Sequence, residues 1–319
     1  MQLNILEELP SSFRASTLIA GWPGMGSVGI GAIDYIRRKL DAVAFAEIDM
    51  NAYFTPEMMM VDDGVVSFPS PPAHTFYAVE AHNLIIFQGD AQINGEPGDE
   101  AMNQVLDVAQ KAGVDTVFTA ASYHTQASHQ EGTQVLAAAN NPDFRDSLEP
   151  FGVEILQEGM VTGLNGLLLG FAAQRGFRAA CLLGTIPQYA VTIPNPKASK
   201  QIVLTLGRIL NFEVDMGEID DAAERMEATM EEIEGQIQKN LSPLEDAPDK
   251  DAMGGKKEEM VPQHVMERIE QLFLEVTETD MQVNFQEKAN ELKEELDRWD
   301  LYSFYEDRFL NLFRSDSGG

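Results

Sequence analysis

Residues 17–31, TLIAGWPGMGSVGIG, limit more than any other stretch what this chain can fold into. The apolar run Leu18–Ala20 predicts a buried strand, and the periodicity of Asp34–Leu40 predicts a helix after it. A G-x-G-x-x-G pattern lies between them, formed by Gly24, Gly26 and Gly29. A strand, a glycine turn and a helix N-terminus can together bind an anion, because glycine lets the backbone approach a ligand and free N–H groups favour negative charge.

Two interpretations of this turn stay open. In a dinucleotide-binding fold, the first glycine follows the strand directly and an acid beyond the next strand binds ribose, about where Glu47 and Asp49 lie. In this chain Gly21-Trp22-Pro23 intervenes, and Pro23 fixes a turn before the glycines begin. We therefore favour a tight turn that seats the first helix against the sheet, with nucleotide binding as the alternative.

The charge balance excludes one class of partner. The chain has 22 Lys and Arg against 52 Asp and Glu, a formal net charge of −30. Binding a phosphate backbone requires clusters of basic side chains, so no nucleic-acid partner is expected.

No apolar run reaches membrane-spanning length, and the N-terminus has no basic region leading into an apolar stretch. We expect an acidic, soluble, cytoplasmic protein with no membrane partner.

The single cysteine, Cys181, rules out an internal disulfide. It lies in residues 179–183, AACLL, which predict a buried strand. An apolar, buried environment favours a packing role for this thiol over a nucleophilic one.

The rest of the pattern alternates strands and helices, over a length that can bury a large core. Strands are predicted at residues 43–48, 83–89, 114–120, 153–156 and 178–184, and helices at residues 98–113, 133–139, 165–173, 198–210 and 220–239. One segment departs from this alternation. Met58–Val61 and Val65–Phe68 flank Asp62-Asp63-Gly64 and predict a β-hairpin, where a dinucleotide fold would place a helix. We predict an α/β fold, a three-layer α/β/α sandwich with a mixed sheet.

A change of composition after residue 215 predicts the domain organisation. The α/β/α domain covers residues 1–240 and ends in an acidic helix. Residues 241–262 contain Pro243, Pro248 and Gly254-Gly255 and predict a flexible linker. Residues 263–314 predict a C-terminal helical module. Its first two helices have apolar faces formed by Val265, Ile269, Leu272, Phe273 and Val276 and by Phe285, Ala289, Leu292 and Leu296.

Three separated motifs resemble the PAC2 family, the proteasome assembly chaperone 2-like proteins. They are residues 21–29 (GWPGMGSVG), residues 159–168 (GMVTGLNGLL), and residues 181–189 (CLLGTIPQY) with residues 194–198 (PNPKA). The resemblance implies a phosphorylase/hydrolase-like α/β/α fold for residues 1–240, a homo-oligomer and, from archaeal and eukaryotic relatives, chaperoning of proteasome α-ring assembly. Proteasome-like subunits are then the implied protein partner. Some relatives dock through a hydrophobic–Tyr–any tail, which residues 314–319 (RSDSGG) lack.

Residues that follow predicted strands define a candidate pocket. The carboxyl ends of parallel strands meet at one edge of a sheet, so we expect them to converge with the glycine turn. The candidate ligand-binding residues are Gly24, Met25, Gly26, Asp90, Gln92, His124, Thr185 and Tyr189.

No catalytic residue, metal site or cofactor is assigned. Ser122, His124 and His129 suggest a hydrolase, but Ser122 lacks the G-x-S-x-G turn that exposes a nucleophilic serine. The histidine spacing suits one helix face poorly, and no third metal ligand is evident. Two functions stay open: a non-enzymatic assembly chaperone or scaffold that binds other proteins, which we favour, and a nucleotide- or phosphate-binding enzyme of the phosphorylase/hydrolase-like group.

Overall fold

The computed structural model describes residues 1–241 apart from Thr55 and Glu57, together with nine helical residues between 268 and 296. The chain divides into two compact units, Met1–Asp246 and Ala247–Gly319. The predicted linker beyond residue 241, the aromatic-rich segment 299–313 and the tail 314–319 lie outside the described residues.

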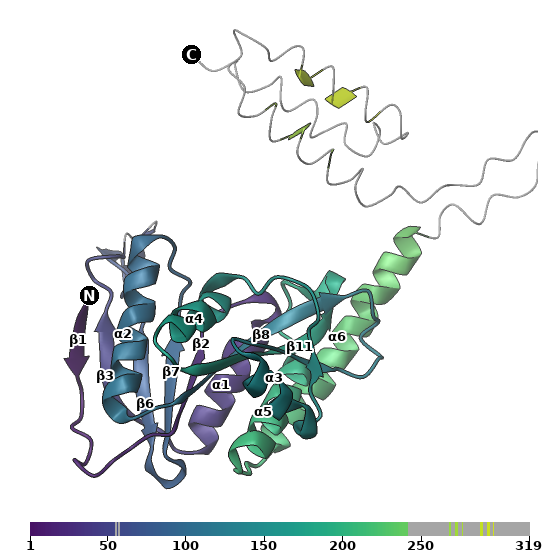
Figure 1. Ribbon diagram of the computed structural model, residues 1–319. Helices are drawn as coiled ribbons and strands as arrows, with labels where there is room; N and C mark the ends of the chain where they lie inside the picture. The colour runs from purple at the N-terminus through teal and green to yellow at the C-terminus, as the bar shows by residue number, and fades with distance from the viewer. Residues whose placement is uncertain are drawn as a thin grey trace, which may run out of the picture. The chain divides into compact units, whose positions relative to one another are not determined.

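The first unit is built on a nine-stranded sheet with the order β1-β3-β6-β7-β2-β8-β11-β9-β10 (Figure 1). Its central strands are largely buried, with apolar runs such as residues 18–20, 84–87 and 179–183, as expected for strands covered on both faces. The strands are β1 (Gln2–Ile5), β2 (Thr17–Gly21), β3 (Val43–Asp49), β6 (His74–Val79), β7 (Leu84–Gly89), β8 (Thr116–Thr125), β9 (Val135–Ala139), β10 (Glu154–Ile155) and β11 (Arg178–Pro187).

The direction of the strands places several loops at one edge. Strands β7, β2, β8 and β11 are neighbours and run parallel, while β6 is antiparallel to both β7 and β3. The C-terminal ends of β3, β7, β2, β8 and β11 therefore share one edge of the sheet, which we call the carboxyl edge. The segment between β3 and β6 lies at this edge as well and forms a separate hairpin, β4 (Met60–Asp62) with β5 (Val65–Ser67).

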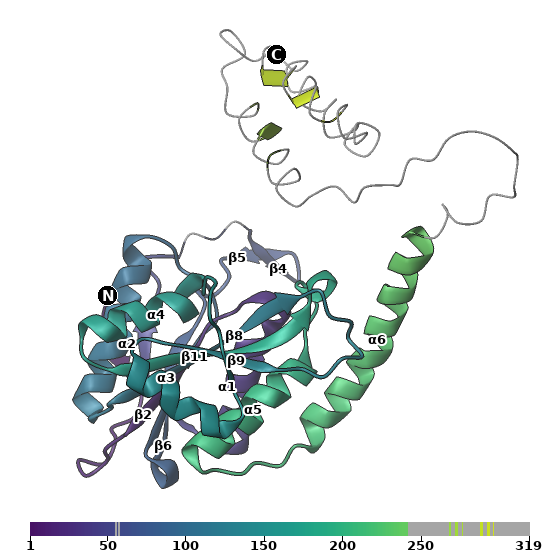
Figure 2. The same cartoon turned by 45° about the vertical axis from the view of Figure 1, so that its right-hand side comes forward.

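Helices cover both faces of the sheet (Figure 2). On one face α2 (Glu96–Ala112) and α4 (Gly163–Gln174) bury their apolar sides in a core with Trp22 and Phe87. On the other face α1 (Val28–Lys39), α3 (Pro142–Leu148) and α5 (Pro196–Leu210) bury theirs, and α6 (Gly217–Leu241) packs on α5. The predicted three-layer α/β/α sandwich with a mixed sheet is confirmed.

One prediction of secondary structure is wrong, and one strand was missed. The helix predicted at residues 133–139 is not formed: Val135–Ala139 form strand β9, and Pro142 begins α3. Pairing with β11 on one side and β10 on the other outweighs the helix propensity of the alanines. Strand β6 was not predicted at all, although its Thr, Phe, Tyr and Val residues are typical of strands.

In the second unit the nine described residues are all helical. Buried apolar residues occur at spacings of three and four, as the predicted amphipathic helices require. They are Leu272, Phe273 and Val276 in the first segment, and Ala289, Leu292 and Leu296 in the second. Within the described part of the chain, no helix is both long enough and apolar enough to cross a membrane.

Candidate functional site

The glycine turn after β2 uses its own backbone groups to hold the fold together. The amide of Gly26 donates to the carbonyl of Val191 (2.7 Å), and the carbonyl of Gly26 accepts from the amide of Asn195 (2.8 Å). The amide of Ser27 donates to the carbonyl of Gly24 (3.0 Å). A phosphate-binding turn would offer the N–H groups of Gly26 and Ser27 to its ligand. Here the Gly26 N–H bonds to the loop that follows β11, and the Ser27 N–H bonds within the turn.

A second segment holds the start of the same turn. The side-chain amide of Asn165, in α4, accepts from the backbone N–H of Trp22 (3.0 Å) and donates to the carbonyl of Trp22 (3.1 Å). The Asn165 carbonyl accepts from the hydroxyl of Thr119 in β8 (2.7 Å). Asn165 is 2% exposed, so all of these bonds lie in the interior. Sequence analysis did not single out Asn165, although an amide near the start of a mostly apolar helix is a sign that it has a buried partner.

The third glycine of the pattern lets α1 approach the sheet. A Cβ atom at Gly29 would overlap the backbone carbonyl of Ala120 in β8. The hydroxyl of Ser199, in α5, donates to the carbonyl of Val28 (2.9 Å) and joins the two helices. The turn therefore seats the first helix against the sheet, as the favoured interpretation expected.

Two of the candidate pocket residues, Asp90 and Gln92, lie after β7, and Gln92 contacts this turn. The side-chain amide of Gln92 donates to the carbonyl of Pro23 (2.6 Å) and accepts from the backbone N–H of Leu164 (3.0 Å). Gln92 thus bridges the glycine turn and the N-terminus of α4. Asp90 is exposed, and its backbone N–H donates to the carbonyl of Ala73.

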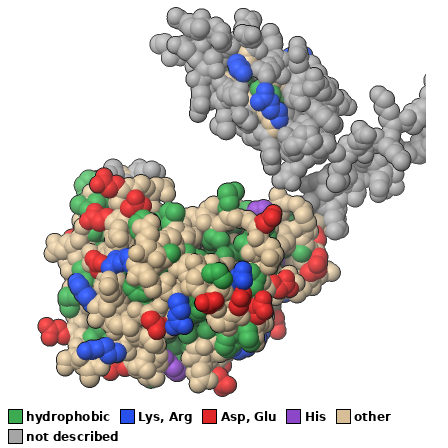
Figure 3. Space-filling view, viewed as in Figure 1, with side chains coloured by type: hydrophobic (Ala, Val, Ile, Leu, Met, Phe, Trp, Pro, Cys, Tyr) green, Lys and Arg blue, Asp and Glu red, His purple; other side chains and the backbone are tan. Residues whose placement is uncertain are grey.

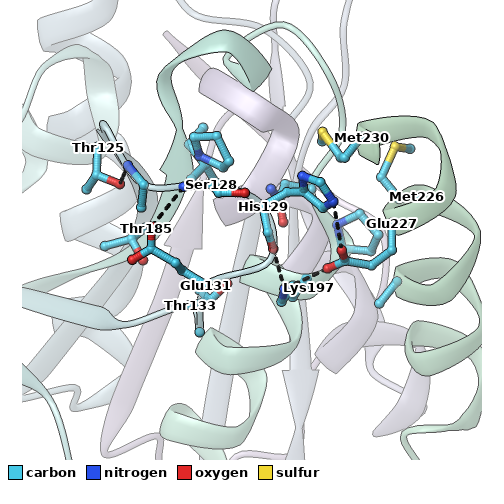
Figure 4. A pocket seen from close by; sticks show the side chains of 17 residues that line it. Thr125, Ser128, His129, Glu131, Thr133, Thr185, Lys197, Met226, Glu227 and Met230 are labelled. Atoms are coloured by element: carbon cyan, nitrogen blue, oxygen red, sulfur yellow. Dashed lines mark hydrogen bonds and ion pairs between the residues drawn. The ribbon is translucent and has the colours of Figure 1, made fainter. Parts of the chain in front are cut away.

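Thr185 and Tyr189 belong to a different group. Thr185 lines a pocket together with residues of α6 (Figure 4). The hydroxyl of Thr185 accepts from the backbone N–H of Gln134 (2.8 Å). The hydroxyl of Tyr189 lies 3.1 Å from Nδ1 of His129 and accepts from the His129 backbone N–H (3.2 Å). Burial, the strongest influence, raises the pKa of this Tyr189 hydroxyl, and the carboxylate of Glu234 raises it further.

His129 is nearly buried and faces carboxylates of α6 on both sides of its ring. Its Nδ1 lies 2.6 Å from Glu234, and its Nε2 lies 3.8 Å from Glu227. Lys197 donates to the carbonyl of His129 (2.6 Å) and pairs with Glu227 (2.6 Å), as Figure 4 shows. These contacts attach α6 to the carboxyl edge and bury the His129 ring between carboxylates of α6.

Two of the candidate residues, Thr185 and Gly26, line different cavities. Thr185 lines a cavity of about 30 Å³, which holds one or two waters and is too small for a metabolite. Gly26 lines a separate open groove of about 680 Å³ between α1, residues 194–199 and α6. Arg38 and Arg225 also line that groove, with Glu218 and Asp221 among them.

The structure therefore brings the eight candidate residues to one edge of the sheet in more than one group. Gly24 and Gly26 lie in the glycine turn, with Gln92 bonded to Pro23 in the same turn. His124 is exposed and stacks on the ring of Tyr123, with 6.2 Å between ring centroids. Met25 is 40% exposed at the tip of the turn, and Asp90 is exposed on a neighbouring loop.

The groups that could act as nucleophiles are engaged in structural contacts. The hydroxyl of Ser122 donates to the carbonyl of Met25 (2.8 Å). Burial raises the pKa of the Cys181 thiol to about 12, so the thiol stays protonated. Among the described residues, no three His, Cys, Asp or Glu side chains are placed to hold a metal ion.

The hairpin at the same edge is exposed and apolar, unlike the turn. Val61 and Val66 pair across β4 and β5 and are 67% and 60% exposed. Phe68, directly after β5, is 72% exposed. Acidic side chains are spread over the visible face of the first unit, and at upper left they lie beside hydrophobic ones (Figure 3). Large apolar side chains are therefore exposed at this hairpin, whereas the glycine turn beside it is bonded into the fold.

Comparisons with known proteins agree with this fold. The model of the PAC2 family matches residues 18–234. An uncharacterized protein of Methanocaldococcus jannaschii is 26% identical over 219 residues, which cover 68% of this chain and 82% of the relative.

Among solved structures, PbaB of Pyrococcus furiosus, an archaeal proteasome activator, is 26% identical with a TM-score of 0.62, covering 73% of this chain and 98% of PbaB. PbaA of the same organism, an archaeal homolog of proteasome-assembly chaperone, is 24% identical with a TM-score of 0.59, covering 76% of this chain and 96% of PbaA, and shares its fold. The family model spans the strand, the glycine turn and the two motifs packed around that turn, so this chain belongs to the PAC2 family.

Proposed function

We propose that this protein is a non-enzymatic assembly chaperone or scaffold that binds other proteins at the carboxyl edge of its sheet. By its likeness to PbaB, the partners are proteasome-like subunits. We also propose that it works in the cytoplasm as a homo-oligomer. Residues 241–262 then act as a linker between the α/β/α domain and a C-terminal helical module.

One observation carries this proposal. At the carboxyl edge, most of the polar groups in and around the glycine turn are bonded within the fold, while large apolar side chains of the neighbouring hairpin face solvent. The Gly26 backbone is bonded on both sides, Ser122 donates to a backbone carbonyl, and both ring nitrogens of His129 face carboxylates. Exposed apolar patches of this kind mark surfaces that bind proteins.

The test is an assembly assay with proteasome α subunits from the same organism. We expect the full chain to bind these subunits and to speed the appearance of α rings, measured by native mass spectrometry over time. An unchanged rate together with no complex between chain and subunit would overturn the chaperone proposal. The oligomer mass of the chain alone, from light scattering, tests the homo-oligomer separately.

A second candidate, a small-molecule-binding enzyme, is favoured only by the 680 Å³ groove beside Gly26, whose volume suits a metabolite. Thermal shifts with nucleotides, nucleosides and phosphate test it. The matched variant is Arg225→Gln, because Arg225 lines the groove and is exposed. A selective shift that this variant abolishes would favour the enzyme over the chaperone.

A further inference from the structure

The hairpin of β4 and β5 exposes apolar side chains on both of its faces. It forms a separate two-stranded sheet, with Val61 opposite Val66 and Met60 opposite Ser67. A two-stranded hairpin without a core is marginally stable in water, so a partner surface would complete it. Its exposed large hydrophobic residues are Met58, Met59, Met60, Val61, Val65, Val66 and Phe68.

The base of the hairpin is fixed to the sheet. Met50, directly after β3, is 4% exposed, and His74, the first residue of β6, is fully buried. The hydroxyl of Tyr53 donates to Glu100 of α2 (2.9 Å). The hairpin is therefore held at both stems while its strands remain open, which is the arrangement of a binding arm on a rigid scaffold.

The stretch of sequence that contains the hairpin is rich in acidic residues. Between Lys39 and Lys111 there is no Lys or Arg, while the same stretch contains twelve Asp and Glu. Asp62 and Asp63 lie at the hairpin turn and are both exposed. An occupant of this surface gains from positive charge beside its apolar residues, because complementary charge steers and selects partners.

The same charges argue against two other occupants. A second copy would bring two such acidic stretches together, and like charges placed opposite one another oppose association. The second occupant would be the C-terminal unit of the same chain. Residues 247–319 also contain more Asp and Glu than Lys and Arg, so their net charge is negative as well.

The open edges of the hairpin favour an extended occupant. In the described part of the chain, β4 and β5 pair only with each other, so each has an outer edge free to accept another strand. Strand addition supplies backbone hydrogen bonds, and the alternating side chains supply specificity. The flexible side chains of Met58, Met59 and Met60 can adapt to different apolar residues.

We propose that the β4–β5 hairpin binds an extended segment of another protein in which apolar residues alternate with, or are flanked by, Lys or Arg. This inference rests on the proposed function as a protein-binding chaperone and names the chemistry that its partner must have. Binding adds a strand to the hairpin and covers Val61, Val66 and Phe68.

The experiment uses the full chain and a fluorescent peptide of alternating Lys and Val, with an alternating Glu and Val peptide as the matched probe. Anisotropy titrations give the dissociation constants. We expect the Lys–Val peptide to bind, and its affinity to fall about tenfold or more in the double variant Val61→Ser/Phe68→Ser, which removes apolar contact without changing charge. The Glu–Val peptide should not bind.

The control variant is Leu167→Ser on α4, which removes a side chain that is also about half exposed. It should keep the affinity of the unmodified chain, which separates hairpin binding from general attraction to an acidic protein. Circular dichroism and the melting temperature of each variant show that the fold is kept. Equal affinity in the double variant, or equal binding of the Glu–Val peptide, would overturn the proposal.

Two further measurements separate this inference from others. A smaller oligomer mass in the double variant would assign the hairpin to a contact between copies and overturn the proposal. In the α-subunit assay, a double variant that works as well as the unmodified chain defeats the hairpin inference and leaves the chaperone function standing. If the unmodified chain fails there, the function fails while the peptide titrations still decide the hairpin.

Discussion

The glycine turn and the β4–β5 hairpin lie at the same edge of the sheet and are built in opposite ways. In the turn, Trp22 and Gly26 each have both their backbone N–H and C=O groups bonded to other segments. In the hairpin, the paired residues Val61 and Val66 are mostly exposed. The region with the clearest sequence motif thus holds the fold together, while a neighbouring region without a motif faces solvent.

This comparison shows that a clear sequence motif can mark a structural contact, while a binding surface can lack any motif. Glycines, a buried asparagine and a proline-rich loop are needed where three segments approach closely and satisfy one another's polar groups. A binding surface needs only exposed apolar area and suitable charge, which many sequences provide. Substitutions in the turn should therefore change stability, and substitutions in the hairpin should change binding.

The largest effect is expected from Gly29→Ala. The added Cβ would overlap the Ala120 carbonyl, so α1 or β8 must move, and we expect the free energy of unfolding to fall by about 3 kcal/mol or more. Urea unfolding followed by circular dichroism measures it.

Gly170→Ala is the matched control for that substitution. Gly170 lies inside α4, and nothing lies within 4 Å of the position of an added Cβ. Alanine is the better helix former, so this variant should gain up to about 1 kcal/mol. A loss in Gly170→Ala as large as that in Gly29→Ala would mean that close approach to Ala120 is not the cause.

The next largest effect is expected from Asn165→Ala. It leaves the N–H and C=O groups of Trp22 without partners in the interior, and we expect a loss of about 2–4 kcal/mol. Hydrogen exchange of the Trp22 amide should become faster as well. Asn103→Ala, which removes an exposed amide bonded to the Asp99 carbonyl, should stay within about 0.5 kcal/mol. Similar losses in both variants would show that the hydrogen bonds between Asn165 and Trp22 are not what stabilises the turn.

A smaller effect is expected from pH, through His74 at the stem of the hairpin. Burial lowers the pKa of His74 below 6.5, and the nearby Pro72 carbonyl and Asp90 oppose this only in part. Below pH 6.5 the unfolded chain takes up a proton that the folded chain does not, so stability falls as the pH drops from 6.5 towards the folded pKa. The loss from this residue is at most about 1.4 kcal/mol per pH unit.

Urea unfolding at pH 7 and pH 5 tests this for His74→Gln and for His124→Gln, whose imidazole is exposed. The pH-dependent loss should shrink in His74→Gln and persist in His124→Gln. An unchanged loss in His74→Gln would assign the pH dependence to other groups.

Much of the fold could be predicted because local pattern and final structure agree there. The strand before the glycine turn, the helix after it and the hairpin at Asp62–Gly64 follow directly from apolar periodicity and turn residues. Strand β9 could not be recognised in this way, since its alanines favour a helix and only pairing with β10 and β11 makes it a strand.

The site was harder to predict, because its contacts join residues far apart in the sequence. Strand order correctly places Gln92, Thr185 and the glycine turn at one edge. The bonds between Asn165 and Trp22 span 143 positions and leave no local signal in the turn itself. Whether the candidate pocket residues bind a ligand stays a prediction.

The smallest effect on stability is expected from Met60→Ala in the hairpin. Met60 is 52% exposed in the folded chain, so its truncation changes little water-accessible apolar area on unfolding, and we expect a change within about 0.5 kcal/mol. Met102→Ala in α2 removes the same atoms from a fully buried position and should cost about 2–5 kcal/mol. If Met60→Ala cost as much as Met102→Ala, the hairpin would have to be covered already in the isolated protein. The glycine turn and the hairpin would then both stabilise the fold, and the hairpin would not be a surface left open for a partner.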